Sequence, residues 1–241
     1  VHGKVIYYYD NGQIENRGSF KNGLRSGKYE AWYNDGTKEE IGFYKKNNKD
    51  SLWTYFYPDG KKHKETYYKE GDPYLVNYWN KQGKQLVKNG DGRYLSYYSE
   101  NQPKEKGHYQ DSLPHGDWTT FYSNGNKKTR GRYDQGEQVG EWTQWYRTGE
   151  KMSQHNYKSG KNIEWYKNGQ KRMVGILEDG EKTGKWSFWT PKGQLLKLAE
   201  YKNGKYHGLL KEYNQNGDLQ RKMQFKEGRP HGDAEWYFED G

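Results

Sequence analysis

Apolar side chains in this chain recur at fixed distances from a repeating glycine. This turn glycine is found about every 24 residues, and Gln102 replaces it once. Its positions are Gly12, Gly36, Gly60, Gly83, Gly125, Gly149, Gly169, Gly193, Gly217 and Gly241. Four residues before each of these positions lies an aromatic residue: Tyr8, Trp32, Phe56, Trp79, Tyr98, Phe121, Trp145, Trp165, Trp189, Tyr213 and Tyr237. Polar residues alternate with these aromatics, which predicts short β-strands and disfavours helices.

Two kinds of turn connect the predicted strands. Asn or Asp precedes the turn glycine at most positions, and such pairs favour the type I′ turn of a two-residue β-hairpin. These residues are Asn11, Asp35, Asp59, Asn101, Asn124, Asn168, Asn216 and Asp240. A second turn joins successive hairpins and is marked by the strings FKNGLRSG (20–27), YDQGEQVG (133–140) and YKNGKYHG (201–208).

The turn position sets the expected pairing of the strands. A two-residue loop pairs the residue seven before the turn glycine with the residue six after it. Trp118 then faces Gly131, and we expect its ring to cover the glycine backbone. Residues seven, five and three before the turn glycine share one face, as Trp53, Tyr55 and Tyr57 do. The aromatic four before the glycine lies on the other face, among polar residues.

These patterns predict an all-β fold. We expect an elongated repeat array of antiparallel β-hairpins that forms a single-layer twisted meander sheet, with about 24 residues per repeat and about 20 strands. Residues 1–241 are predicted to form one continuous array of about ten repeats. The pattern is irregular near 84–92, where the aromatic of the second strand is missing, and at 160–162, where a link is shortened.

Composition limits the kind of core and partner. Hydrophobic residues make up 30% of the 241 residues and aromatic residues 17%, so more than half of the apolar side chains are rings. The chain has no Cys, which excludes disulfides and thiolate metal sites. Its net charge is +9, but the 41 basic and 32 acidic residues are interleaved. A solvated surface explains this pattern better than a nucleic-acid partner does.

The repeating unit resembles a known family. The strings YKNGKYHGLL, YDQGEQVGEW and FKNGLRSGKY are similar to the MORN repeat, and the 24-residue spacing is similar to its bacterial variant. The resemblance covers almost the whole chain and implies an elongated, twisted sheet of hairpins. It also implies a scaffold, a protein-binding or membrane-surface-binding role, or an antitoxin-like partner in a two-gene toxin system.

The aromatic-rich face is the candidate interaction site. It carries Tyr7, Tyr9, Tyr29, Tyr33, Trp53, Tyr55, Tyr57, Tyr78, Tyr97, Trp118, Tyr122, Trp142, Tyr146 and Trp186, of which the residues from Tyr29 onward form the predicted site. Such rings either pack as a one-sided core or bind a partner. We expect a non-catalytic scaffold or protein-protein interaction module that binds through this face or through a strand edge. The alternative is a module that binds cell-wall or host glycans, and single-stranded nucleic acid is a weaker option.

Catalytic and metal chemistry find little support. His2, His115, His207 and His231 each precede a linker glycine, and His207 and His231 are expected about 10 Å apart, too far for one zinc ion without a third ligand. The chain has no nucleophile elbow, phosphate-binding glycine loop or HExxH motif. We therefore expect no catalytic residues, no metal and no cofactor.

The ends and the location complete the expectations. The chain starts within a motif and stops at a turn glycine, so we expect the native protein to extend further at one or both ends. Dimerisation through terminal strand edges is a further expectation. A secreted or cell-surface bacterial protein fits the absence of Cys, with a cytoplasmic protein as the alternative.

Overall fold

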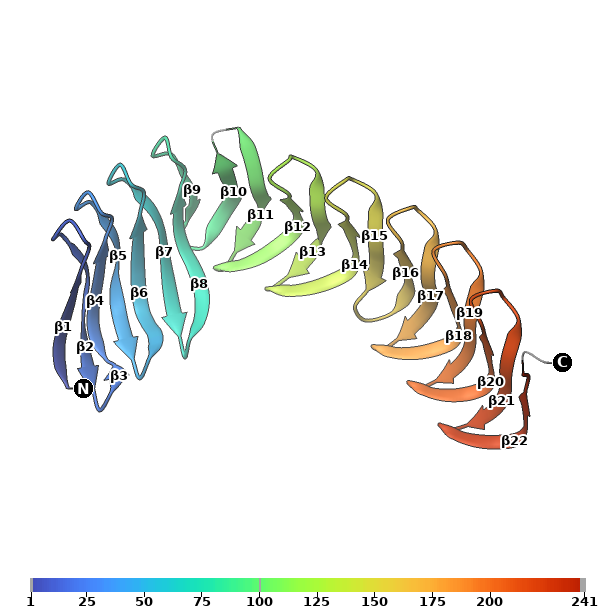
Figure 1. Ribbon diagram of the computed structural model, residues 1–241. Helices are drawn as coiled ribbons and strands as arrows, with labels where there is room; N and C mark the ends of the chain where they lie inside the picture. The colour runs from blue at the N-terminus through green and yellow to red at the C-terminus, as the bar shows by residue number, and fades with distance from the viewer. Residues whose placement is uncertain (1, 100, 239–241) are drawn as a thin grey trace. The chain divides into compact units, whose positions relative to one another are not determined.

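The computed structural model describes residues 2–99 and 101–238, and within these ranges it consists of β-strands without helices (Figure 1). The chain divides into two compact units, one of residues 1–97 and 105–116 and the other of residues 98–104 and 117–241. The turn glycine at 241 and its preceding Asp240 lie outside the described residues. The predicted all-β class with antiparallel hairpins is confirmed.

In the first unit the strands form an antiparallel meander, in which β2 pairs with the short β3 and also with β4, and each strand from β4 to β9 pairs with the next. Its strands are β1 (Gly3–Tyr8), β2 (Ile14–Lys21), β3 (Leu24–Arg25), β4 (Gly27–Trp32), β5 (Lys38–Lys45), β6 (Asn48–Phe56), β7 (Lys62–Lys69), β8 (Asp72–Trp79) and β9 (Gln85–Lys88). The next three strands, β10 (Asp91–Ser99), β11 (Gln102–Gln110) and β12 (Leu113–Phe121), each contain residues of both units.

The second unit repeats the same meander. Its remaining strands are β13 (Lys127–Asp134), β14 (Glu137–Trp145), β15 (Lys151–Asn156), β16 (Gly160–Trp165), β17 (Lys171–Glu178), β18 (Glu181–Trp189), β19 (Leu195–Lys202), β20 (Lys205–Tyr213), β21 (Leu219–Lys226) and β22 (Arg229–Trp236). All pairings from β13 to β22 are antiparallel and join consecutive strands.

The predicted turn type was wrong. Around Gly12 the loop has three residues, because Gly12 N donates to Tyr9 O and Tyr9 N donates to Gln13 O. Only the glycine is left-handed, with φ 81°. Asn11 uses its side chain instead: its Oδ1 accepts from Gln13 N and its Nδ2 donates to Asn34 O in the next turn. The two-residue turn with positive φ at both positions occurs in the linker, as at Asn203 (φ 48°) and Gly204 (φ 72°).

A β-bulge after the turn restores the predicted register, as the hairpin at Gly36 shows. In the second hairpin Trp32 pairs with Lys38 and Ala31 pairs with Glu40, so Glu39 is an extra residue. Beyond the bulge Tyr29 pairs with Gly42, which confirms the predicted pairing of the residue seven before the turn glycine with the residue six after it. The bulge compensates for the longer loop. It also places the extra residue, here Glu39, on the face opposite to the one that strict alternation along the strand predicts.

The ring that covers each strand glycine is not the predicted one. A Cβ placed on Gly131 would lie 2.1 Å from Cδ2 of Trp142, whereas we expected Trp118 there. Trp53 covers Gly42 in the same way, with 2.2 Å to its Cδ2. The covering ring belongs to the next strand, because the linker turn and its bulge bring that strand's tryptophan over the glycine. The indole is then anchored through Nε1, as Trp142 donates to Arg132 O at 3.2 Å.

Tyrosine hydroxyls connect successive repeats. The tyrosine three before a turn glycine donates its hydroxyl to a backbone carbonyl of the following repeat, at distances of 2.7–3.0 Å. The bonds run from Tyr9 to Trp32, Tyr33 to Phe56, Tyr57 to Trp79, Tyr122 to Trp145, Tyr146 to Trp165 and Tyr166 to Trp189. Each repeat therefore fixes the orientation of its neighbour's tyrosine ring within a unit.

Replacing Tyr33 by Phe is expected to lower the free energy of unfolding by about 1 kcal/mol, because the Phe56 carbonyl loses its side-chain donor. Chemical denaturation followed by circular dichroism measures this change. Tyr8→Phe is the control, since Tyr8 is 59% exposed. Equal stability of the two variants would show that the inter-repeat hydroxyl bond contributes nothing.

Both irregular segments expected from the sequence have distinct structures. β9 has only four residues, and Gly92 has φ 142°. A small core lies beside it, formed by Leu75, Tyr78 and Val87. At the second segment the side chain of Asn162 accepts from Asn156 N and donates to Gly160 O, which closes the short link between β15 and β16.

Candidate functional site

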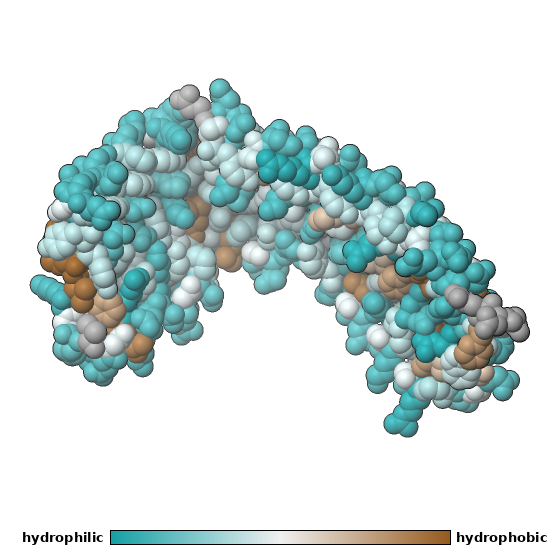
Figure 2. Space-filling view, viewed as in Figure 1, coloured by the Kyte–Doolittle hydropathy of each residue, from teal (hydrophilic) through white to brown (hydrophobic). Residues whose placement is uncertain are grey.

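A groove lies on the front face of the first unit, the face that carries Trp53, Tyr55 and Tyr57. It has a volume of about 400 Å³ and is open to solvent. We call it the tyrosine–glutamate groove; its lining residues are Tyr9, Glu15, Asn16, Tyr29, Ala31, Tyr33, Glu39, Glu40, Tyr55, Phe56, His63 and Lys64. Figure 2 shows that the surface is mostly hydrophilic in this view, with hydrophobic side chains in small groups.

The groove follows from the local sequence. Asn16, Ala31 and Glu40 form a cross-strand row, and Tyr55 continues that row on β6. Ala31 is the residue five before its turn glycine, a position that is Tyr7 and Tyr55 in the repeats on either side. The small side chain between larger ones leaves a hollow in the face.

The turns supply the walls of the groove. Tyr9 and Tyr33 stand three residues before their turn glycines, and their hydroxyls are tied to backbone carbonyls of the next repeat. Glu15 and Glu39 are the extra residues of the two bulges, which place them beside these rings on the front face. The rings are held rigidly, whereas the carboxylates are free to meet a ligand.

Negative charge in the groove is destabilised. Burial raises the pKa of Glu39 above its ordinary value, and the nearby carboxylates of Glu40 and Glu15 raise it further, against a smaller opposing effect of Lys49. Burial, together with Glu40, also raises the pKa of Tyr29 to about 12. A cation in the groove would relieve this repulsion.

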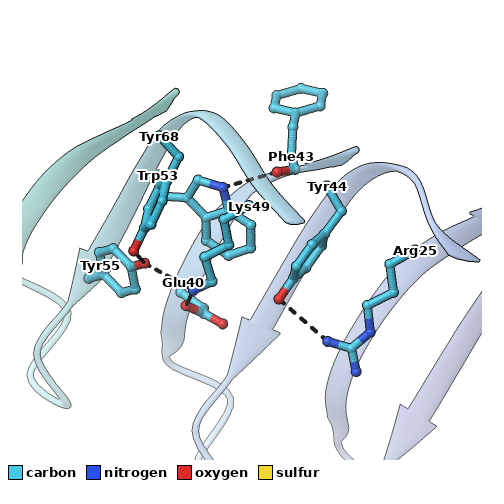
Figure 3. Close-up of polar contacts among 8 residues, drawn as sticks. All are labelled: Arg25, Glu40, Phe43, Tyr44, Lys49, Trp53, Tyr55 and Tyr68. Atoms are coloured by element: carbon cyan, nitrogen blue, oxygen red, sulfur yellow. Dashed lines mark hydrogen bonds and ion pairs between the residues drawn. The ribbon is translucent and has the colours of Figure 1, made fainter. Parts of the chain in front are cut away.

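Lys49 neutralises one side of the groove (Figure 3). Its Nζ lies 2.8 Å from Glu40 Oε2, 2.9 Å from the Tyr55 hydroxyl and 3.8 Å from the centroid of the Trp53 ring. The hydroxyls of Tyr55 and Tyr68 are 3.0 Å apart. Glu40 is therefore already paired, and Trp53 is fully buried beneath this cluster.

The far end of the groove is uncharged or basic. His63 packs between Tyr57 and Tyr78, with ring centroids 4.4 and 5.7 Å away. Burial, with a contribution from Lys64, lowers the pKa of His63 to about 4, so the imidazole is neutral at pH 7. The Nζ of Lys64 lies 4.6 Å from the centroid of the Tyr55 ring.

The first unit brings three predicted site residues into the groove, namely Tyr29, Tyr33 and Tyr55. Trp53 and Tyr78 are instead buried, with exposed fractions of 0% and 2%. The Tyr78 hydroxyl donates to Leu95 O, and the Tyr57 hydroxyl donates to Trp79 O. Tyr97 is 39% exposed and lies outside the groove.

In the second unit the predicted residues mainly support the sheet. The three tryptophans at the covering position are at most 6% exposed: Trp118, Trp142 and Trp186. The hydroxyls of Tyr122 and Tyr146 are bound to carbonyls of the next repeat. These rings therefore pack within the sheet, which is one of the two roles expected for them from the sequence.

The sequence analysis missed the carboxylates of the groove. Glu15 and Glu39 both stand three residues after a turn glycine, in a strand whose alternation assigns them no front-face position. Only the bulge puts them there. The sequence signal that could have identified them is their shared position three residues after a turn glycine. Using it requires knowing that the turn has three residues and is followed by a bulge.

The groove has features of a binding surface. Among the described residues, no group of three or more His, Cys, Asp or Glu side chains is arranged to hold a metal ion. The described part of the chain also has no helix long and apolar enough to span a membrane. Rigid rings and free carboxylates in an open hollow can bind a partner by contact.

Comparisons with curated proteins and solved structures give little similarity. No curated protein matches the chain. Two solved structures, "Crystal Structure of TcdB2-TccC3" and "Crystal Structure of TcdB2-TccC3-Cdc42", share 9% and 11% identity over 90% and 92% of this chain, with TM-scores of 0.22 and 0.20. The chain spans 16% and 13% of those chains, and such low scores support no functional argument.

The repeat itself is identified by a family model. The model described as "MORN repeat variant" matches seven segments of the chain: residues 1–22, 49–70, 90–111, 114–135, 138–159, 182–203 and 206–227. These segments lie in both units and begin close to the linker turns seen in the structure. The chain belongs to the MORN repeat variant family.

Proposed function

We propose that the chain is a non-catalytic protein-binding module and that its first unit binds a partner protein through the front face. The observation that carries this proposal is the tyrosine–glutamate groove, in which the Tyr9 and Tyr33 rings are fixed by hydrogen bonds to the neighbouring repeat. Rings fixed before binding lose little conformational entropy when a partner docks, which favours affinity.

The two units differ in a way that favours the first as the binding unit. Five residues before the turn position, the first unit has Tyr7, Ala31, Tyr55, Tyr78 and Tyr97, whereas the second has Thr120, Gln144, Glu164, Phe188, Glu212 and Trp236, so tyrosines are concentrated in the first unit. Tyr7 is 49% exposed, so a front-face ring is accessible beside the groove. Aromatic side chains with accessible faces are typical of protein interfaces.

Site-specific photo-crosslinking tests this proposal. A benzophenone amino acid replaces Tyr7 in one variant and Gln144 in a second, which occupies the same register position in the second unit. After irradiation in cells of the source organism, we expect the first variant to yield a defined crosslinked protein, identified by mass spectrometry, and the second variant to yield none. Front-face contact in the first unit is the physical reason for this difference.

Two outcomes would contradict the proposal. Equal crosslinking from both positions would show that the partner does not select the first unit. Loss of the crosslink when soluble cell-wall glycans are added, with direct quenching of tryptophan fluorescence by those glycans, would favour the glycan-binding alternative.

A further inference from the structure

The two units carry different charges at the bulge position of the front face, three residues after the turn glycine. In the first unit these residues are Glu15, Glu39, His63, Leu86 and Glu105. In the second unit they are Lys128, Met152, Arg172, Leu196 and Gln220. The fold therefore accepts a carboxylate, a cation or a neutral side chain at this position. Because folding does not require a particular charge there, the charge of this side chain can contribute to binding instead.

In one repeat of the second unit the chain provides its own cation for the tyrosine ring. The Nζ of Lys128 lies 5.9 Å from the centroid of the Tyr122 ring, three residues before the same turn glycine. In the first unit the equivalent rings are Tyr9 and Tyr33, and the residues that correspond to Lys128 are Glu15 and Glu39. An aromatic face beside a carboxylate attracts a cation by two additive effects.

These carboxylates are available for such a contact. Glu40 is bound to Lys49, whereas the described structure shows no ion pair for Glu15 or Glu39. Like-charge repulsion between the carboxylates also leaves this end of the groove in need of a counter-ion.

We propose that the tyrosine–glutamate groove binds an extended, lysine- or arginine-bearing segment of the partner protein, with one cation beside Glu15 and Tyr9 and the next beside Glu39 and Tyr33. This inference rests on the proposed protein-binding function and specifies the chemistry of the partner.

The spacing of the repeat predicts the spacing of the cations. Glu15 lies on β2 and Glu39 on β5, and β4 pairs with both of these strands. Two strand steps correspond to about 10 Å, the length of about three residues of extended chain. In an extended segment of the polyproline II type, residues three apart lie on the same side and about 9 Å from each other, so a basic residue at every third position matches this distance.

The groove also limits how many cations it accepts. Lys49 and Lys64 stand on the side towards β6 and β7, and His63, in the position of Glu39, is neutral at pH 7. A third partner cation at the His63 repeat would find a neutral imidazole in place of a carboxylate. The site therefore selects a segment with two spaced cations and disfavours a long polybasic tract.

Fluorescence anisotropy with labelled peptides tests the inference directly. A peptide built from Lys-Ser-Ser repeats is the probe, compared with the same peptide carrying acetyl-lysine and with Glu-Ser-Ser repeats. We expect the wild-type chain to bind the lysine peptide at low salt, and to bind both comparison peptides about tenfold or more weakly.

Charge reversal in the groove provides the matched variants. Glu15→Lys with Glu39→Lys reproduces the cation found at Lys128 and is expected to weaken binding of the lysine peptide about tenfold or more, with an unchanged unfolding midpoint. Glu15→Gln with Glu39→Gln serves the same purpose if the lysine variant is less stable. Glu105→Lys is the control, because Ser99 stands where the tyrosine would be, and we expect it to retain full binding.

The outcomes separate this inference from the function on which it rests. No binding of the lysine peptide, equal binding of the acetylated peptide, or full binding by the charge-reversed variant would each overturn the inference. If one of these occurs while the crosslink from position 7 persists, the protein-binding function stands and only the partner chemistry is wrong. Loss of that crosslink alone contradicts the proposed function.

Discussion

Replacing Gly131 by Ala is expected to lower the free energy of unfolding by about 1–3 kcal/mol, although the change adds only one methyl group. The new Cβ would lie 2.1 Å from Cδ2 of Trp142, which is much shorter than the van der Waals contact distance of two carbon atoms. The ring has little room to move, because it is only 4% exposed and its Nε1 donates to Arg132 O. Denaturant unfolding followed by tryptophan fluorescence measures the loss.

The chain contains the matched control for this variant. Ala199 stands at the position of Gly131, and it pairs with Leu210, which occupies the position of Trp142. In a Trp142→Leu background, Gly131→Ala is therefore expected to cost less than about 0.5 kcal/mol. If alanine costs the same in both backgrounds, the indole does not cause the requirement for glycine.

Replacing Glu30 by Gln is expected to destabilise the first unit by about 2 kcal/mol at pH 7, because the change removes a buried charge shared by three cations. The carboxylate is 4% exposed and lies 2.6 Å from Arg17 Nη2, 3.0 Å from Lys38 Nζ and 3.3 Å from Lys28 Nζ. Burial raises its pKa, but hydrogen bonds from Lys38, Arg17 and Lys28 outweigh this effect and lower the pKa to about 2.

The pH dependence of stability follows from the lowered pKa. The folded-state pKa of Glu30 lies below its unfolded value near 4.5, so its contribution is complete above that value and is lost as the pH falls towards 2. The difference in unfolding free energy between wild type and Glu30→Gln should therefore shrink from pH 5 to pH 3. Glu178→Gln, on the exposed side of β17, is the control. A constant difference, or equal stability of the two variants at pH 7, would contradict this account.

Repeated glycines made the strands predictable. Each turn glycine marks a hairpin whether its loop has two or three residues, so the meander and the pairing of Tyr29 with Gly42 followed from spacing alone. The turn type did not, because Asn11 can either adopt positive φ or accept a hydrogen bond from Gln13 N, and only the folded loop shows the second. Which ring covers Gly131 likewise depends on the linker bulge, which displaces the next strand.

The candidate site was predicted only in part. Tyr29, Tyr33 and Tyr55 line the groove as front-face residues of their strands. A ring's exposure was not readable from the sequence, because Trp53 and Tyr7 both belong to the front face, yet one is fully buried and the other is 49% exposed. The difference arises from the side chains packed around the Trp53 ring, such as Tyr29 of the preceding repeat and Lys49 of its own strand.

The sequence by itself determined that this chain is a β-hairpin array, since turn-forming residues and alternating aromatics act locally and recur in every repeat. Only the tertiary structure decided where the array forms a groove. The bulges turn Glu15 and Glu39 to the face of the tyrosines, and Ala31 leaves the hollow between them. Both effects depend on how one strand is shifted against the next, which is a property of paired strands and not of any single segment.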